Sequence, residues 1–239
     1  MGRYSIPLAP QFAEFADVGA EERVLDVGCG PGALTAELVR RLGPSAVSAV
    51  DPSEPFVAAA RDRQPGVDVQ RASAEQLPFP DGGFDTSLAQ LVVHFMADPI
   101  KGLREMARVT RPGGVVAACV WDHAGGEGPL SRFWEAAREL DPDVEDESDL
   151  AGSRKGHLAE LLRDAGLNEV EEAVLCVGVE HVSFDEWWEP FTLGVGPAGA
   201  YLSELEPERR TRLREHCRNG FPEGSLIVTA CAWAARGHV

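Results

Sequence analysis

The sequence predicts an α/β fold built on a mainly parallel, doubly wound, seven-stranded sheet with helices on both faces. Two observations support it. Apolar runs of strand length alternate with segments of helical spacing, which is typical of parallel sheets covered on both faces. The apolar run at residues 225–236 differs from the others because no helix follows it. The predicted strands are residues 23–28, 46–51, 67–71, 84–90, 115–121, 174–182 and 225–236.

Helical segments are predicted between these strands. Leu34, Leu38 and Leu42 recur at a spacing of four, which places them on one helical face. Gly43 and Pro44 follow at once and are typical stop signals. The other predicted helices are residues 54–63, 100–109 and 156–165.

Length and composition favour one domain over residues 1–239, because 44% of the residues are hydrophobic and can form a sizeable core. Within it we expect an N-terminal cap at residues 1–22 and a ligand-binding core at residues 23–121. Residues 123–154 and 183–224 do not fit the alternation. Both would leave the carboxyl edge of the sheet, where open α/β folds bind ligands, so we expect them to wall the site.

The chain is strongly acidic, with 39 acidic against 22 basic residues and a net charge of −17. Such a charge repels phosphate backbones and anionic lipid, so neither nucleic acid nor a membrane is an expected partner. We expect the acidic stretch at residues 141–149 to be a solvated loop rather than a calcium site. With no apolar run of spanning length and no secretory pattern, the sequence predicts a soluble, cytoplasmic protein.

The cysteines are five in number and widely scattered, without a C-x-x-C pair. This pattern favours reduced thiols over a disulfide framework or a zinc site, and no metal is expected. The residues concerned are Cys29, Cys119, Cys176, Cys217 and Cys231.

Three glycines, Gly28, Gly30 and Gly32, separate the first predicted strand from its helix. Glycine lets the backbone turn sharply and approach a ligand, and the helix that follows presents its positive dipole end. Asp51 ends the second strand, where a carboxylate can accept both hydroxyls of a ribose. An adenosine-type ligand is therefore favoured over a bare phosphate.

The loop alone does not distinguish between nucleotide ligands. It reads G-C-G-P-G-A, with Ala33 where a dinucleotide fingerprint has its third glycine, although alanine is sometimes allowed there. Asp26 lies inside the first strand, where a carboxylate would repel a pyrophosphate and suit a cationic ligand. It could equally brace the glycine turn, and the two roles can coexist.

The sequence resembles the class I S-adenosylmethionine-dependent methyltransferases, in particular the small-molecule subgroup called type 11 or ubiquinone/menaquinone-biosynthesis-like. The resemblance covers about residues 23–121, and it implies a Rossmann-like sheet with an antiparallel last strand. The motifs that carry it are "VLDVGCGPG", "VDPSEPFVAAAR", "ASAEQLPFPDGGFD", "LVVHFMADP" and "LREMARVTRPGG".

The resemblance implies that S-adenosylmethionine is the cofactor and S-adenosylhomocysteine the product. Gly28, Cys29 and Gly30 would line the methionine end, with Asp26 close to its ammonium group. Gln90 and its neighbours would close the pocket beside the sulfonium.

At the adenosine end, the resemblance implies that Asp51 binds the ribose. Pro52 and Ser53 would lie along the adenosine, and Ala74 would offer its backbone N–H to the adenine.

One departure from the family pattern concerns the adenine contact. Family members often read G-D-A-E where this chain reads A-S-A-E. The acidic contact to the adenine amino group is then replaced by the Ser73 hydroxyl or falls to Glu75.

Methyl transfer needs alignment and exclusion of water more than a dedicated base, because the sulfonium is already activated. His94 is the first candidate base, since it matches the first histidine of the family's H-H-V-P-D-P. It could instead be a structural histidine. Asp122 and His123 are second candidates from their position after the fifth strand.

Acceptor binding is expected in residues 184–201, where Trp188, Phe191 and Tyr201 accompany several glycines. Rigid aromatic rings suit an apolar or aromatic small-molecule acceptor, and the glycines suit a lid. Ordinary packing of these rings is the alternative. The polar-Pro-Pro-aromatic motif of nucleic-acid amino-methyltransferases is missing after the fourth strand, which also points to a small molecule.

Two other functions remain open on sequence grounds. An NAD(P)-dependent oxidoreductase shares the glycine loop and the ribose-binding carboxylate, but Asp26, the missing third glycine and the strand without a following helix disfavour it. A non-catalytic S-adenosylmethionine-binding protein would keep the binding motifs, because binding is not turnover.

Overall fold

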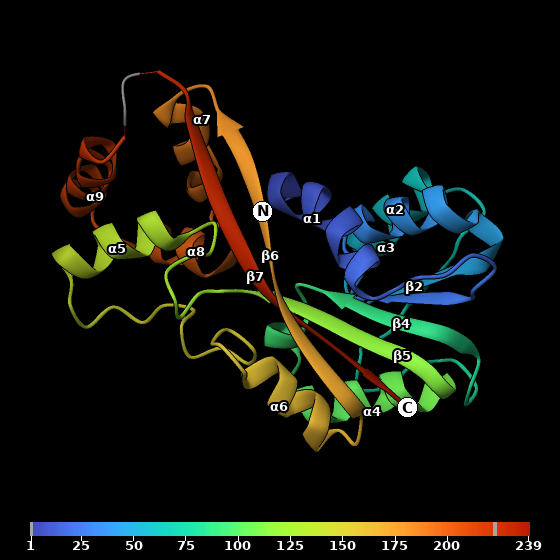
Figure 1. Ribbon diagram of the computed structural model, residues 1–239. Coiled ribbons are helices and arrows are strands. Elements are labelled where there is room, and N and C mark those ends of the chain that lie inside the picture. The colour runs from blue at the N-terminus through green and yellow to red at the C-terminus, as the bar shows by residue number, and fades with distance from the viewer. Residues whose placement is uncertain (1, 222–223) are drawn as a thin grey trace.

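The computed structural model describes residues 2–221 and 224–239, and these residues form one seven-stranded sheet (Figure 1). The strand order is β3-β2-β1-β4-β5-β7-β6. This arrangement confirms the predicted α/β fold class. The strands are β1 (Val24–Val27), β2 (Val47–Asp51), β3 (Asp68–Arg71), β4 (Phe84–Gln90), β5 (Thr110–Trp121), β6 (Asn168–His181) and β7 (Leu226–His238).

Strands β1 to β5 pair in parallel, and β7 runs antiparallel to both β5 and β6. The chain winds outward from β1 to β3, then returns to place β4 on the other side of β1. Ligands of open α/β sheets bind at such a switch point, outside the carboxyl ends of the strands. The fold therefore directs attention to the loops that follow β1, β2 and β4.

Helices cover both faces of the sheet, as predicted (Figure 1). Residues of the central strands alternate between the two faces: Val24 packs in one apolar cluster and Leu25 in the other. One face carries α1 (Gly2–Phe15), α2 (Ala33–Leu42) and α3 (Glu54–Arg63), and the opposite face carries α4 (Pro99–Val109) and α6 (His157–Asp164).

The two stretches that do not fit the alternation contain helices, and these gather at one end of the molecule (Figure 1). We call this group the helical cap. The β6–β7 hairpin runs from the sheet into the cap, so the cap and the core share two long strands (Figure 1). The cap consists of α5 (Ser131–Leu140), α7 (Phe184–Trp188), α8 (Gly196–Glu204) and α9 (Pro207–Asn219).

Short 3-10 turns complete the described secondary structure. They are η1 (Pro44–Ala46), η2 (Val93–Phe95) and η3 (Glu189–Leu193). Of these, η2 follows β4 directly and therefore lies at the carboxyl edge of the sheet.

The expectation of five reduced thiols is wrong for one pair. Cys176 on β6 and Cys231 on β7 form a disulfide, with their Cα atoms 4.1 Å apart. The two residues are register partners in the antiparallel hairpin, which brings their side chains together. Their spacing in the sequence carries no sign of this pairing. Cys29, Cys119 and Cys217 are free and buried.

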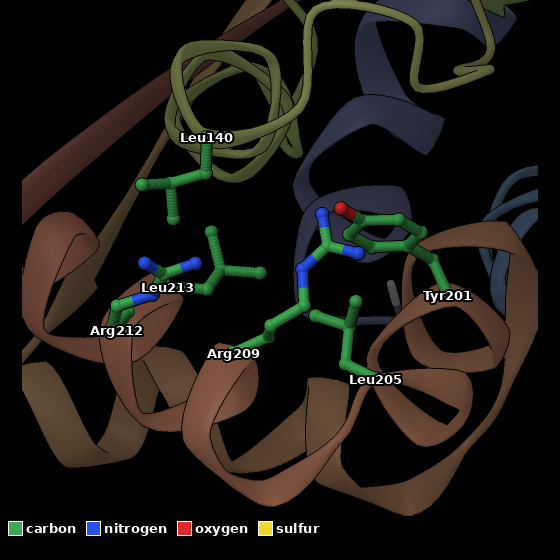
Figure 2. A pocket seen from close by; sticks show the side chains of 6 residues that line it. All are labelled: Leu140, Tyr201, Leu205, Arg209, Arg212 and Leu213. Carbon is green, nitrogen blue, oxygen red and sulfur yellow. The ribbon is translucent and has the colours of Figure 1, made fainter.

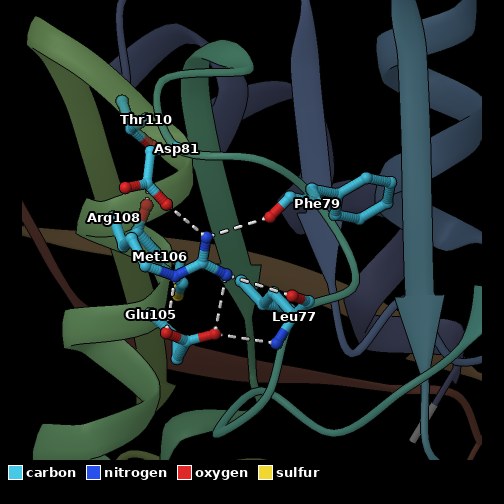
Figure 3. Close-up of polar contacts among 7 residues, drawn as sticks. All are labelled: Leu77, Phe79, Asp81, Glu105, Met106, Arg108 and Thr110. Atoms are coloured by element: carbon cyan, nitrogen blue, oxygen red, sulfur yellow. Dashed lines mark hydrogen bonds and ion pairs between the residues drawn. The ribbon is translucent and has the colours of Figure 1, made fainter.

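Hydrogen bonds from Arg108 join two of the sequence motifs, "ASAEQLPFPDGGFD" at residues 72–85 and "LREMARVTRPGG" at residues 103–114 (Figure 3). The Arg108 guanidinium donates to the backbone oxygens of Leu77 and Phe79 and to the carboxylates of Asp81 and Glu105. Glu105 in turn accepts the Leu77 N–H at 2.9 Å. Helix α4 thus fixes the loop between β3 and β4, whose first residues border the carboxyl edge of β2.

None of the helices formed by residues 2–221 and 224–239 combines the length and apolar character needed to cross a membrane.

Candidate functional site

The glycine loop between β1 and α2 is held by the neighbouring strand. The N–H groups of Gly28 and Cys29 both donate to the Val50 oxygen, at 2.8 and 2.9 Å. Gly28 has φ of 72°, and a Cβ atom there would lie 2.5 Å from the Val92 side chain. Gly30 has φ of 52°, but a Cβ atom there would meet nothing within 4 Å. Gly28 is therefore required for packing, whereas Gly30 faces open space that a ligand can use.

Asp51 ends β2 and is only 6% exposed. Its two carboxylate oxygens accept the backbone N–H groups of Gly30 and Ser53, at 2.9 and 2.8 Å. Each oxygen has a further lone pair, so the carboxylate can still accept two hydroxyls. Ser53 occupies the N-cap position of α3 without a side-chain capping hydrogen bond and is half-buried, and Pro52 is exposed. This arrangement fits a ribose with both hydroxyls on Asp51.

Asp26 is 1% exposed and accepts the Thr35 hydroxyl at 2.6 Å. Burial raises the pKa of Asp26 to about 7; the nearby Asp51 carboxylate adds to the rise, and hydrogen bonds from Thr35 oppose it. The bond to Thr35 ties β1 to α2, which is the bracing role. A carboxylate with so high a pKa also gains when a cation binds beside it, so the structure accommodates both roles.

The loop after β3 approaches the end of β2, where the Ala72 N–H donates to the backbone oxygen of Asp51. Ala74 is buried and Ser73 is exposed. The Glu75 carboxylate accepts the Ala97 N–H at 2.8 Å. One Glu75 oxygen is thus bonded to the backbone, and both Ser73 and Glu75 stay candidates for the polar contact to adenine.

Gln90 is the last residue of β4 and is 8% exposed. It lies at the level of Gly28, because Asp26 and Leu88 are register partners two residues earlier. Its amide nitrogen donates to the Ser5 oxygen at 3.1 Å, so the first turn of α1 covers it. Its amide oxygen is buried and has no hydrogen-bond partner among the described residues.

The candidate bases His94 and His123 come together after β4 and β5, with ring centroids 5.8 Å apart. Burial lowers the pKa of His94 to about 3, and the neighbouring His123 lowers it further. Burial also lowers the pKa of His123 to about 4, although the carboxylates of Asp146 and Asp122 oppose this. Both rings are therefore neutral at pH 7.

Asp122, the other second candidate, stabilises the loop that follows β5: its carboxylate accepts the Gly125 N–H at 2.7 Å. A Cβ atom on Gly125 would lie 2.3 Å from that carboxylate, so the two residues are closely fitted.

Glu147 is a residue of this region that sequence reasoning missed. It belongs to the acidic stretch expected to be a solvated loop, yet it is 4% exposed. It accepts the Trp134 indole N–H at 2.8 Å and lies 3.9 Å from Nδ1 of His123. Burial raises the pKa of Glu147. One buried carboxylate in a run of acidic residues has no signature in the sequence, so only the fold reveals it.

The aromatic residues expected to bind the acceptor are part of the cap's packing. Trp188 and Phe191 are 5% and 7% exposed, and Phe191 stacks on Phe133 with centroids 4.7 Å apart. Tyr201 lines a separate pocket between α5, α8 and α9, together with Arg209 and other residues (Figure 2). Trp188 and Phe191 therefore pack inside the cap, and Tyr201 lines a separate pocket.

Comparison with known proteins places this site in a family. Residues 25–118 match the family described as a methyltransferase domain, type 11. A 2-methyl-6-phytyl-1,4-hydroquinone methyltransferase from Oryza sativa is 33% identical over 61% of this chain and 42% of its own length. A malonyl-[acyl-carrier protein] O-methyltransferase from Erwinia pyrifoliae is 35% identical over 50% of each chain. The chain thus spans about half the length of these curated relatives.

Solved structures agree on the fold. An S-adenosylmethionine-dependent methyltransferase from Thermotoga maritima superposes with a TM-score of 0.59, covering 99% of this chain and 90% of that one at 22% identity. The open space at Gly30 and the accepting capacity of Asp51 fit the cofactor of this family. Residues 25–118 therefore form a class I S-adenosylmethionine-dependent methyltransferase domain of type 11, which supports S-adenosylmethionine as the cofactor.

Proposed function

We propose that this chain transfers a methyl group from S-adenosylmethionine to a small-molecule acceptor that is apolar or aromatic. The observation that carries the proposal is the Asp51 carboxylate, fixed by two backbone N–H groups at the switch point with both oxygens able to accept more bonds. Of the two curated relatives, one is named for the methylation of a hydroquinone, which supports a small aromatic acceptor, and the other for the methylation of malonyl-[acyl-carrier protein].

Each part of the chain has a role in this proposal. Asp51 holds the ribose, with Pro52 and Ser53 beside the adenosine and the loop at Ser73 and Ala74 along the adenine. The glycine loop of residues 28–30 lines the methionine end, where the Asp26 carboxylate attracts its ammonium group. When bound, the cofactor supplies an activated methyl group on a sulfonium.

The chain's remaining task is to orient the acceptor and exclude water. With the cofactor bound, the chain would hold the acceptor's reacting atom in line with the methyl carbon and opposite the sulfur, and the proton displaced from the acceptor would pass to solvent as the product leaves. His94 and His123 remain neutral, since their pKa values are about 3 and 4, and so are poorly matched to act as bases at pH 7. We propose that they orient the acceptor through hydrogen bonds.

A melting experiment with S-adenosylhomocysteine tests the cofactor assignment. A ligand that binds only the folded state raises the melting temperature by mass action. We expect a rise with S-adenosylhomocysteine and none with NADH or NADPH. A rise with NADH alone would assign the chain to the oxidoreductases.

Titration calorimetry on Asp51→Ala tests directly whether the Asp51 carboxylate binds the ribose. Two ribose hydroxyls would lose a charged acceptor, and hydrogen bonds to charged groups contribute roughly 1.5–3 kcal/mol each. Asp51→Glu should bind more tightly than Asp51→Ala but less tightly than the wild type. Unchanged affinity of Asp51→Ala for S-adenosylhomocysteine would remove this residue from the site.

A non-catalytic binding protein is the second candidate, because burial lowers the pKa values of both candidate bases and so makes them weak proton acceptors. It predicts the same melting shift without methyl transfer to any acceptor. Release of S-adenosylhomocysteine from S-adenosylmethionine in the presence of small phenols and quinols, followed by mass spectrometry, separates the two.

A further inference from the structure

Buried polar atoms without partners gather at one edge of the sheet. In residues 2–221 and 224–239, most side-chain nitrogen or oxygen atoms of this kind follow or end β4, β5 and β6. A buried donor or acceptor left unpaired costs roughly 1–3 kcal/mol, so a group of them calls for an explanation. The residues in question are Gln90, His94, Trp121, His123 and His181.

Three of these residues surround the first turn of α1. The Tyr4 ring lies edge-on to the Trp121 ring with centroids 6.3 Å apart. The Tyr4 hydroxyl lies 2.8 Å from Nε2 of His181, and the backbone oxygen of Ser5 accepts from Gln90. We define the N-terminal polar cluster as Tyr4, Gln90, Trp121 and His181; these residues are 6%, 8%, 1% and 3% exposed.

The unpaired atoms of this cluster offer complementary hydrogen-bonding groups. Trp121 presents an indole N–H, which is only a donor, and Gln90 presents an amide oxygen, which is only an acceptor. Burial raises the pKa of Tyr4 to about 12, so its hydroxyl keeps its proton and can donate it to Nε2 of His181. Nδ1 of His181 is a second unpaired atom: it is a donor in the tautomer whose Nε2 accepts from Tyr4, and an acceptor in the tautomer whose Nε2 donates to Tyr4.

The cluster borders the glycine loop. Gln90 is level with Gly28 on the adjacent strand, and Trp121 lies two residues beyond Cys119, the register partner of Gln90. A molecule bound by the cluster would therefore lie at the carboxyl edge of β4 and β5, next to the methionine end of the cofactor site.

Charge and shape narrow the class of molecule. An ion pair that acts on His181 joins Arg3 to Glu186 at 2.6 Å and carries no net charge. Burial lowers the pKa of His181, and Arg3 adds to this while Glu186 opposes it, so the ring is neutral at pH 7. The flat rings of Tyr4 and Trp121 favour a planar partner, and the chain's charge of −17 disfavours an anion.

We propose, building on the methyltransferase function above, that the N-terminal polar cluster is the acceptor subsite and that the acceptor is a neutral ring compound bearing hydroxyl or carbonyl oxygens. The Trp121 N–H donates to such an oxygen, the Gln90 amide oxygen accepts a hydrogen bond from a hydroxyl, and Nδ1 of His181 donates or accepts according to its tautomer. The first turn of α1 is then part of the acceptor site and not only a packing element.

Three probes test the class of molecule in the presence of saturating S-adenosylhomocysteine: hydroquinone, p-xylene and 4-hydroxybenzoate. Saturation-transfer NMR measures their affinities. We expect hydroquinone to bind at least about tenfold more tightly than p-xylene, as one or two hydrogen bonds allow, and 4-hydroxybenzoate to bind more weakly than hydroquinone. Equal binding of p-xylene, preference for the anion, or no binding of any probe overturns the proposal.

A double variant tests the residues. Tyr4→Phe with His181→Phe removes the bonded pair and the unpaired nitrogen together while keeping two rings, so no partner is left alone. We expect the preference for hydroquinone over p-xylene to fall about tenfold. Gln11→Leu is the matched control, because it removes another hydrogen bond from α1 to β6, the one to the Cys176 oxygen, outside the cluster. Its preference should equal that of the wild type.

A purely structural role would weaken all probes alike and leave the preference unchanged, which contradicts the proposal. If the double variant does not fold, Trp121→Phe provides the same measurement, since it removes one unpaired donor and keeps a ring. Calorimetry with S-adenosylhomocysteine separates two kinds of failure. A wild-type protein that does not bind it overturns both proposals, whereas normal binding with the wrong probe pattern overturns only this one.

Discussion

The cofactor side of the molecule and the helical cap are built on different principles. On the cofactor side, backbone turns set the geometry: Gly28 adopts a left-handed conformation and the Asp51 carboxylate is fixed by backbone N–H groups. In the cap, side chains set the geometry: Phe133 is fully buried and contacts the rings of Trp188 and Phe191. A single added carbon can disrupt the first region, whereas the second depends on filled volume.

This difference predicts different responses to substitution. Changes on the cofactor side should alter ligand affinity with only local structural effects. Changes in the cap should lower the stability of the fold more than they lower cofactor affinity. The residues of the cofactor site lie on or just after β1, β2 and β4, outside the cap.

The largest effect is expected for Phe133→Ala in the cap. Removing a buried phenylalanine ring costs about 3–5 kcal/mol, because it loses apolar contact and leaves a cavity. Hydrogen exchange should show increased opening of α5, α7 and α8 with little change in β1 and β2. Phe133→Leu is the control and should lose much less. If Phe133→Ala lowers the affinity for S-adenosylhomocysteine as severely as Asp51→Ala does, the cap and the cofactor side do not respond independently to substitution.

The disulfide in the hairpin shared by both regions should have the next largest effect. Closing the loop between Cys176 and Cys231 restricts the unfolded chain, and disulfides typically contribute about 2–4 kcal/mol. We expect the double variant Cys176→Ala/Cys231→Ala to melt at a lower temperature than the oxidised wild type. A reducing agent should lower the melting temperature of the wild type and leave that of the variant unchanged. A reducing agent that affects both equally would show that the bond does not stabilise the fold.

Two glycines on the cofactor side form a matched pair. Gly28→Ala places a carbon 2.5 Å from the Val92 side chain in a left-handed conformation, and together these effects cost about 2–4 kcal/mol. Gly30→Ala carries the same conformational cost without a clash. Melting curves should show the larger loss for Gly28→Ala, while calorimetry should show that folded Gly30→Ala binds S-adenosylhomocysteine more weakly than wild type. The reverse order of stabilities would contradict our account of the loop.

The smallest effect on stability is expected for Asp26→Asn, and its sign depends on pH. Between about pH 4 and pH 7, folded Asp26 holds a proton that the unfolded chain has released, so stability falls as pH rises. The rise in pKa from 3.8 to about 7 corresponds to roughly 4 kcal/mol. The altered contact with Thr35 offsets part of this, so we expect Asp26→Asn to be stabilised by about 1–2 kcal/mol at pH 8.

The same variant should bind S-adenosylmethionine more weakly than wild type at pH 8, because the charge that attracts the ammonium group is gone. In the wild type, affinity should fall as pH drops below about 7 and Asp26 becomes protonated. Denaturant titrations and calorimetry at pH 6 and pH 8 measure both effects. A stability loss in Asp26→Asn at pH 8 would mean that bracing dominates.

The position of the cofactor side could be predicted because its residues lie in short motifs at the ends of predicted strands. The glycines, Asp26 and Asp51 lie within or next to predicted strands, so strand order alone brings them to one edge of the sheet. The helix predicted at residues 54–63, between the second and third strands, is confirmed as α3 (Glu54–Arg63). The assigned roles of these residues in binding remain predictions.

The features that could not be predicted are contacts between residues that are distant in the sequence. Cys176 and Cys231 meet only because the hairpin has one register, and Tyr4 meets His181 only because β6 passes beside α1. Glu147 approaches His123 only because α5 and its following loop fold back. None of these pairs has a spacing rule, so sequence patterns could not reveal them.

The order of the strands also has a consequence for synthesis of the protein on the ribosome. Strand β6 is made well before β7, yet β7 lies between it and β5 in the sheet. Until residues 226–238 have emerged, β6 has neither of its bonding edges satisfied by the sheet, and the cap cannot dock through the hairpin. The core through β5 can form during translation, whereas the cap must wait, and in that interval β6 is open to pairing with other chains.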